Sequence, residues 1–431
     1  KTFKVLHKYF ESTTFYYHNK NGQNSRPNAH AIFSGNRIES LHIGTKRQLN
    51  IIMEEEVKNS CHNPVKDDHL IMFDFEKLNY AIALADDWVN GFYWPSCKGY
   101  SHLPTEHYMR PLSKLHEENK KFYAKHFIDG ACITIVHKTL EYMSVFLKSH
   151  LGIAKFMHIW TSVLSHNRLY DVNSIDDITA DFFRQNIDAL NNSFIFFMGD
   201  HGLRFGKFRG TPIGAMEDNN PMLEVALPSW LRRHKELIIN IRDNSHLHTS
   251  HYDLYATFVD IAKVARKDNF MTFRDHDFRE ELGPIRGRRA KSLFRPIKTN
   301  RTCEEMDIAE EYCLCVEKWI TVNQTSNFSR SAGQYIADAI NSILKEKKLD
   351  HLCEKLQLKE VLKEEKHESQ TVVRMKISTV PSGIFEAQLR YDDGQYHIAS
   401  DIYRIDGYGK RADCASWSED RRYCHCKGGQ T

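Results

Sequence analysis

The sequence predicts an α/β protein built on a doubly wound, mostly parallel sheet, followed by a smaller cysteine-rich α+β region. Short apolar runs alternate with helical patterns through the first part of the chain, and residues 371–404 alternate with period two, as antiparallel strands do. Seven of the ten cysteines fall at or after Cys303. We therefore expect an α/β domain over residues 1–282, a basic linker over 283–302 and a cysteine-rich region over 303–431.

Apolar patterning and turn residues place the elements of the first domain. A helix is expected over residues 2–10, and a second from Ser25, as its N-cap, to Gly35, with Pro27 in its first turn. Further helices are expected over 133–151, 174–190 and 229–242, and one opening at 250–253. Strands are expected over 12–18, 78–84, 155–161, 193–198 and 222–227. Residues 206–221 read as a basic loop.

In the last region, residues 303–366 are predicted to be mostly helical, with the charged run 359–366 as a solvated helix face. Three or four antiparallel strands follow, and residues 414–426 are predicted to form a cysteine-stapled loop.

The stretch from Asn192 to Gly206 organises the first domain. Its Phe-rich run is typical of a strand buried on both faces, and it stops at Gly199-Asp200-His201-Gly202. Open α/β sheets carry their chemistry at the carboxyl ends of strands. Adjacent Asp200 and His201 can offer an oxygen and an imidazole nitrogen to one metal ion. The alternative is an ordinary turn, because Asp, His and Gly are common loop residues.

Composition bounds the class of protein. The formal net charge of +3 arises from 59 basic and 56 acidic residues, which argues against a dedicated nucleic-acid binder. No apolar run is long enough to span a bilayer. The opening Lys1-Thr2-Phe3-Lys4 is no signal peptide and indicates a fragment or a processed product.

Cysteines and sequons favour a secreted, disulfide-bonded glycoprotein, and a reduced cytosolic protein with chance sequons is the alternative. An odd number of cysteines lies on each side of the expected linker, so either a bridge joins the two parts or two thiols are free. The sequons start at Asn191, Asn300, Asn323 and Asn327, and the cysteines are Cys61, Cys97, Cys132, Cys303, Cys313, Cys315, Cys353, Cys414, Cys424 and Cys426.

Several stretches together resemble the alkaline phosphatase and sulfatase superfamily, and more closely its secreted animal branch filed as domain of unknown function 229. The resemblance covers nearly the whole chain. It is carried by Ser25-Arg26-Pro27-Asn28, Ala85-Asp86-Asp87-Trp88, Leu164-Ser165-His166, Phe197-Met198-Gly199-Asp200-His201-Gly202, Asp253-Leu254-Tyr255-Ala256-Thr257 and Tyr423-Cys424-His425-Cys426.

The resemblance implies a metal-dependent hydrolase or transferase of phosphate or sulfate esters. A hydroxyl nucleophile would form a covalent intermediate while a divalent ion (zinc, calcium or magnesium) activates it. It also implies that the superfamily's first strand, with a metal-binding Asp, lies upstream of Lys1, where a membrane anchor could also lie. The implied roles are nucleophile for Ser25, ligand or oxyanion contact for His166, metal ligands for Asp200, His201 and His251, and substrate-anion contacts for Arg204 and Lys207.

Two other interpretations stay open. A catalytically inactive relative would keep the fold as an extracellular binding or interaction glycoprotein. A redox or zinc protein built on the Cys-x-Cys pairs would instead carry free thiolates. Ser25 stands where formylglycine sulfatases have Cys, so that class of sulfatase is disfavoured.

Overall fold

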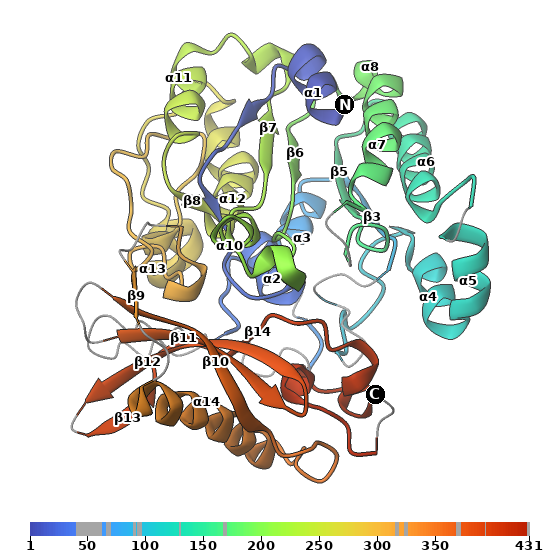
Figure 1. Cartoon of the computed structure of the whole chain (residues 1–431). Helices are drawn as coiled ribbons and strands as arrows, with labels where there is room; N and C mark the ends of the chain where they lie inside the picture. Colours follow the sequence, from blue (N-terminus) through green and yellow to red (C-terminus); the bar gives the residue numbers. More distant parts are fainter. Residues whose placement is uncertain are drawn as a thin grey trace. The chain divides into compact units, whose positions relative to one another are not determined.

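The computed structural model describes residues 1–39, 63–65, 70–88, 92, 97–128, 131–166, 170–314, 319–322, 326–367, 372–392 and 394–428. The chain divides into two compact units (Figure 1). Unit 1 comprises residues 1–38, 56–203 and 217–306, and unit 2 comprises residues 39–55, 204–216 and 307–431.

The described part of unit 1 contains two three-stranded sheets and a short parallel pair (Figure 1). One sheet is parallel, in the order β4 (His107–Tyr108), β3 (Ala81–Asp86), β5 (Lys155–Trp160). The other is antiparallel, in the order β1 (Thr13–Thr14), β7 (Leu223–Ala226), β6 (Ile195–Met198). The pair is formed by β2 (His18–Asn19) and β8 (Thr249–Ser250).

Strand residues of both sheets alternate between the same two apolar clusters. In β6, Phe196 packs into one cluster and Phe197 into the other, and in β5 the residues Phe156 and Met157 divide in the same way. The first cluster is covered by α2 (Ser25–Ser34), α3 (Ile71–Glu76), α11 (Lys235–Asn244), α12 (His251–Val259) and α13 (Arg279–Arg289). The second is covered by α1 (Thr2–Phe10), α4 (Arg110–Glu118), α5 (Lys120–Phe127), α6 (Ile135–Ser149), α7 (Asn173–Gln185) and α8 (Ile187–Leu190).

This arrangement confirms a mixed α/β class with helices on both faces of the strands. It does not confirm one doubly wound sheet, because β5 and β6 pair on only one side within the described residues. All residues of β5 and β6 are only partly buried, whereas β7 is buried throughout. The partial exposure of β6 is unusual, because apolar strands of this kind are normally buried on both faces.

Unit 2 is an antiparallel sheet packed on one long helix. Its strands follow the order β13-β12-β11-β10-β9, and β14 pairs with β12. The helix α14 (Asn327–Glu346) buries Ile336 and Ile340 against Met375 and Phe385. The strands are β9 (Trp319–Thr321), β10 (Gln357–His367), β11 (Val372–Val380), β12 (Gly383–Asp392), β13 (Gln395–Ile398) and β14 (Tyr403–Arg404).

Several short elements connect these. The segment after β6 forms α9 (Gly206–Arg209) and α10 (Pro212–Asn219), so residues 206–221 are not the basic loop that was predicted. A π turn, η4 (Asp260–Val264), continues α12. The other short turns are η3 (Ser229–Leu231), η5 (Ala265–Asp268), η6 (Glu310–Tyr312), η7 (Gly409–Ala415) and η8 (Glu419–Tyr423).

Residues 283–302 differ from the exposed linker that was predicted. They begin inside α13 and continue into a segment where Leu293 and Phe294 are fully buried in the first cluster. The arginines of this stretch misled the prediction because Arg289 and Arg295 are themselves buried and paired. The charged run 359–366 is also not helical. It lies within β10, where cross-strand pairs such as Glu365–Arg374 stabilise a charged strand.

The helix over residues 2–10 and the antiparallel strands after residue 371 are confirmed. Disulfides join Cys353 to Cys424 and Cys414 to Cys426, and Cys97, Cys303 and Cys313 are also disulfide-bonded. The exposed Cys132 is free. Cys61, Cys315 and Asn323 lie outside the described residues. Within the described residues, no helix has the length and apolar character needed to cross a membrane.

Candidate functional site

The Asp200-His201 pair lies directly after β6, in a loop fixed from one side. The N–H of Gly199 donates to the Met222 carbonyl oxygen at 3.1 Å, which extends the β6–β7 pairing by one residue. The N–H of Gly202 donates to the Asp218 carbonyl oxygen at 3.0 Å. A Cβ at Gly202 would lie 2.2 Å from the carbonyl oxygen of Glu217, so only glycine fits there. The loop therefore presents the two side chains from a rigid turn.

The His201 ring has one nitrogen committed and one directed at the site. Its Nδ1 lies 2.7 Å from the carbonyl oxygen of Gly202. A carbonyl oxygen only accepts, so Nδ1 carries the proton and the neutral ring has its lone pair on Nε2. That nitrogen lies 3.4 Å from Asp200 Oδ2 and 3.5 Å from Ser25 Oγ.

Ser25 is the first residue of α2, and its hydroxyl is partly exposed. The N-cap is Asn24, whose side chain accepts from the Arg26 N–H at 3.1 Å, so the prediction that Ser25 is the cap was wrong. Asn24 provides the acceptor, which leaves the Ser25 hydroxyl available to other partners. The predicted end of the helix is confirmed: Gly35 has φ 65°, and a Cβ there would meet the Tyr255 ring at 2.3 Å.

The spacing of these three atoms suits a bound cation. Asp200 Oδ2 is buried and accepts no hydrogen bond within the described residues. A carboxylate oxygen that faces an imidazole lone pair at 3.4 Å is repulsive unless a proton or a cation lies between them. Two ligand atoms that are each ~2.1 Å from a tetrahedral ion lie about 3.4 Å apart. The 3.4 Å between Asp200 Oδ2 and His201 Nε2 therefore fits a divalent ion shared by these two side chains, with Ser25 Oγ 3.5 Å from the same nitrogen.

Two buried histidines, His18 and His251, are hydrogen-bonded to each other and to the main chain of the Asp200 loop. His251 Nε2 lies 2.7 Å from the Asp200 carbonyl oxygen, so Nε2 carries the proton and Nδ1 accepts. His18 Nε2 donates to that Nδ1 at 3.0 Å, and Thr249 Oγ donates to His18 Nδ1 at 3.1 Å. Burial lowers the pKa of His251 to about 4 and that of His18 well below its usual range. Both rings are therefore neutral at physiological pH, as the donor and acceptor assignments of their nitrogens require.

His251 was predicted to be a metal ligand, but its hydrogen bonds indicate a positioning role instead. Both of its ring nitrogens have partners, and the one nearest the loop donates to the main chain of Asp200. A ligand role would require one of these hydrogen bonds to be lost. In this arrangement His251 positions Asp200.

The loop before α2 is held by buried polar side chains that the sequence analysis did not single out. Asn28 Oδ1 accepts from the N–H groups of Asn21 and Gly22, and Asn21 Oδ1 accepts from the His251 N–H at 3.0 Å. Lys20 and Asp218 form a fully buried ion pair at 2.7 Å. The sequence carried one signal for this network: four polar residues in a row, His18-Asn19-Lys20-Asn21, next to a predicted strand. Such residues are seldom buried unless hydrogen bonds or ion pairs satisfy them, and each of the four makes one here.

His166 belongs to a separate turn. Its ring packs edge-on against Trp88, with centroids 5.5 Å apart. The turn is held by Asp87, whose Oδ1 accepts from the Ser162 N–H at 2.8 Å and whose Oδ2 accepts from the Val163 N–H at 3.2 Å. Burial raises the pKa of Asp87 to about 7 despite these hydrogen bonds. The described contacts join Ser25 to His201 and His201 to Asp200.

Arg204 and Lys207 belong to unit 2. Arg204 is buried, with its guanidinium carbon 4.4 Å from the Phe205 ring centroid, and Lys207 is exposed in α9. Their predicted role as substrate-anion contacts stays a prediction.

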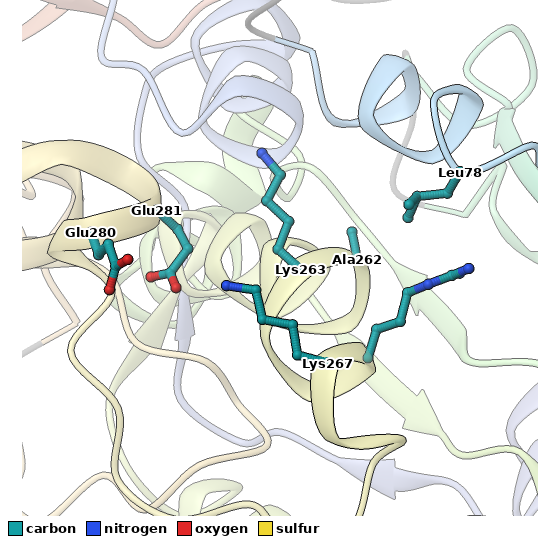
Figure 2. Close-up of a pocket in the computed structure, with 7 residues that line it drawn as sticks. Leu78, Ala262, Lys263, Lys267, Glu280 and Glu281 are labelled. Atoms are coloured by element: carbon teal, nitrogen blue, oxygen red, sulfur yellow. The ribbon is translucent and has the colours of Figure 1, made fainter.

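Unit 1 also has a surface pocket beside η4 and α13 (Figure 2). Its wall mixes both signs of charge, with Lys263 and Lys267 on one side and Glu280 and Glu281 in α13. None of the candidate site residues lines it. Among the described residues, three side chains of the types that bind metals have their ligand atoms close together, and these are Cys353, Cys414 and Cys424. Their sulfurs are in disulfides and are therefore not metal ligands.

Fold and site together define a mixed α/β protein whose β6 end presents a carboxylate, an imidazole and a helix-borne hydroxyl. The chain belongs to the family described as protein of unknown function (DUF229), whose model matches residues 1–362. The match takes in the whole candidate site and ends within β10. No curated protein matches the sequence.

Proposed function

We propose that this protein is a secreted metal-dependent hydrolase or transferase of phosphate or sulfate esters, and a relative of the alkaline phosphatase and sulfatase superfamily. The observation that carries the proposal is the contact of Ser25 Oγ and Asp200 Oδ2 with the same nitrogen of His201. A nucleophile, a carboxylate and an imidazole are the groups that such an esterase needs at one strand end.

Asp200 and His201 would hold the divalent ion, which would be zinc, calcium or magnesium. When bound, the ion supplies Lewis-acid polarisation of the ester and lowers the pKa of a nearby hydroxyl. Ser25 stands at the N-terminus of α2, where the helix dipole favours a negative oxygen. Its Oγ forms a bond to phosphorus or sulfur while the bond to the leaving oxygen breaks, and water or another acceptor later releases the group.

A second candidate function is an extracellular binding or interaction glycoprotein that keeps the fold without catalysis. The number of ligands favours it: among the described residues, the proposed ion has one oxygen from Asp200 and one nitrogen from His201, whereas catalytic zinc sites use three protein ligands. The two candidates differ in whether any ester is turned over.

Secretion forms part of both candidates. The disulfides are consistent with an extracellular protein. The sequon residues Asn300 and Asn327 are exposed and could carry glycans. Treatment of the secreted protein with an N-glycosidase should increase its gel mobility, and unchanged mobility would remove the glycoprotein claim.

An esterase assay tests the proposal. Aryl phosphates and aryl sulfates are offered to the wild type, Ser25→Ala and Ser34→Ala, each with zinc, calcium or magnesium. Ser34 is the matched control, because it lies on the same helix and its buried hydroxyl has local partners: it donates to the His30 carbonyl oxygen at 2.7 Å and accepts from the Asn36 N–H at 3.4 Å. We expect turnover of one ester class, a loss of roughly 10³-fold in Ser25→Ala and little change in Ser34→Ala.

Turnover that survives in Ser25→Ala would remove Ser25 as the nucleophile. No turnover by the wild type with any of the three ions would contradict the enzyme and favour the binding glycoprotein.

A further inference from the structure

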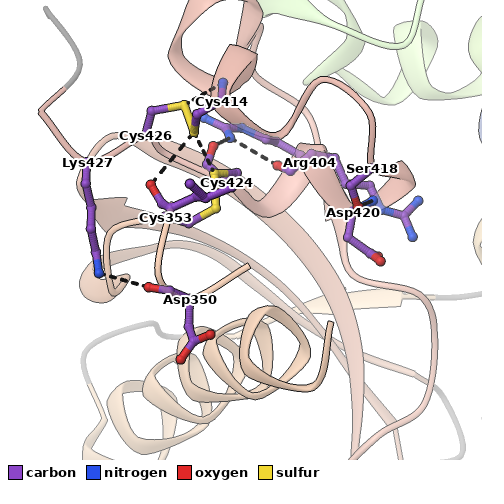
Figure 3. Close-up of a disulfide and its surroundings, with 11 residues drawn as sticks. Asp350, Cys353, Arg404, Cys414, Ser418, Asp420, Cys424, Cys426 and Lys427 are labelled. Carbon is purple, nitrogen blue, oxygen red and sulfur yellow. Dashed lines mark hydrogen bonds between the residues drawn. A yellow bond between two sulfur atoms is a disulfide. The ribbon is translucent and has the colours of Figure 1, made fainter. Parts of the chain in front are cut away.

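The C-terminal tail of unit 2 carries two disulfides whose sulfurs form a single cluster. Cys353–Cys424 ties the tail to the segment that follows α14, and Cys414–Cys426 closes a loop within the tail. Figure 3 shows the four sulfurs gathered at one place. The Sγ atoms of Cys414 and Cys424 lie 3.7 Å apart although they belong to different disulfides. That is van der Waals contact, close to the distance at which reacting atoms are poised for attack.

The two disulfides differ in access. Cys353 is 2% exposed and Cys424 is fully buried, whereas Cys414 is partly exposed. Cys414 is the partly exposed residue of the four cysteines, so we expect an external thiol to attack there rather than at the Cys353–Cys424 bridge. The buried bridge is approached from inside, by the Cys414 sulfur.

The surroundings stabilise the thiolates that such attack would produce. The Cys414 N–H donates to Cys426 Sγ at 3.1 Å, which favours Cys426 as a leaving thiolate. The buried Arg404 donates to the carbonyl oxygen of Cys424 at 3.2 Å and is paired with Asp406 at 2.9 Å, so it fixes the backbone of the cluster (Figure 3).

We propose that these four cysteines form a thiol–disulfide exchange site that accepts electrons from an external dithiol. One thiolate of the dithiol attacks Cys414 Sγ, and the electron pair of the broken bond leaves on Cys426. The second thiol of the reductant then closes its own disulfide and releases the Cys414 thiolate. The dithiol is oxidised by two electrons, and the Cys414–Cys426 bridge is reduced.

The Cys414 thiolate next attacks Cys424 Sγ. A Cys414–Cys424 bond forms, the Cys353–Cys424 bond breaks, and its electron pair leaves on Cys353, with no net oxidation or reduction. The tail then loses its covalent link to residue 353.

Hydrogen bonds keep the sulfurs together while the bonds change. The Glu354 N–H donates to the His425 carbonyl oxygen at 2.7 Å, and the Lys427 N–H donates to the Leu352 carbonyl oxygen at 2.9 Å. Cys353 and Cys426, the two thiols left after exchange, face each other across an antiparallel bridge. An external disulfide can then oxidise these two thiols to a Cys353–Cys426 disulfide and is itself reduced to two thiols, which gives the alternative pairing.

Disulfide mapping of the folded chain tests the proposal. Cys132 is first blocked with N-ethylmaleimide, the protein is pulsed with limiting dithiothreitol without denaturant, and free thiols are trapped with iodoacetamide. We expect a peptide pair linked through Cys414 and Cys424, with the trapping label on Cys353 and Cys426. Label on Cys414 and Cys426, with Cys353–Cys424 intact and no new linked pair, would overturn the proposal.

A pair of double variants isolates the internal route. In Cys414→Ser/Cys426→Ser the buried bridge should be reduced at least about 10-fold more slowly than in the wild type, because the internal nucleophile is gone. In the matched Cys353→Ser/Cys424→Ser variant, the remaining bridge should open at the wild-type rate. Equal reduction of Cys353–Cys424 with and without Cys414 contradicts the internal route. If either variant fails to fold, the wild-type mapping decides the question alone.

Discussion

The ion pair between Asp260 and Arg295 gives a sharp test of how unit 1 is held together. Asp260 is fully buried and Arg295 is 8% exposed, and two hydrogen bonds of 2.8 Å join them in a bidentate fork. The same guanidinium donates to the Arg274 carbonyl oxygen at 2.9 Å. The pair joins the end of α12, which carries His251, to the buried segment after α13. Asp260→Asn should lower the free energy of unfolding by about 3–5 kcal/mol, because it strands a buried charge.

Urea unfolding followed by tryptophan fluorescence measures this loss. The control is Glu11→Gln, which breaks an Arg233–Glu11 pair of similar length, 2.9 Å, whose side chains are 79% and 50% exposed. That change should leave the unfolding curve almost unchanged, because solvent screens an exposed ion pair. The double replacement Asp260→Leu/Arg295→Met should recover much of the stability, since no charge is left buried. Equal losses in Asp260→Asn and Glu11→Gln would refute the reasoning.

Three further predictions follow from single residues. Gly202→Ala should destabilise the loop and remove any bound metal, because its Cβ would meet Glu217 O at 2.2 Å, and retained metal and melting temperature would contradict this. Burial lowers the pKa of His30 to about 3, so His30 binds fewer protons folded than unfolded, and the stability that it contributes is lost as pH falls from about 6.5 towards 3. His30→Gln should remove a pH dependence on the order of 5 kcal/mol from acid unfolding curves, and an unchanged acid limb would show that His30 is not responsible. The exposed Cys132 should react stoichiometrically with a maleimide in the folded protein, and Cys132→Ser should abolish that labelling.

Local patterns predicted the elements better than their pairing. Thr2–Phe10 and Ser25–Ser34 carry their own helix signals, namely apolar spacing and the terminal Gly35, so their bounds could be read from the sequence. Sheet order depends on contacts between distant segments, such as Phe196 opposite Val225. No local signal shows that β6 pairs antiparallel with β7. The buried arginines Arg289 and Arg295 misled the prediction for a similar reason, because their partners lie far away in the sequence.

The candidate site shows the same division. Ser25 and His201 were both singled out for chemistry, and the structure places their side chains 3.5 Å apart across a sequence separation of 176 residues. His251 was also singled out, but its partner His18 was not, and only the fold shows that the two rings bond to each other. Residue types at strand ends and helix starts could therefore nominate candidates, whereas the roles depend on which nitrogen faces which neighbour.

Metal content tests the central claim most directly. Elemental analysis of the secreted protein should find about one zinc, calcium or magnesium ion per chain in the wild type and in the exposed control Asp243→Asn, and none in Asp200→Asn. Absence of metal from the wild type, or equal metal in Asp200→Asn, would contradict a metal site at the end of β6.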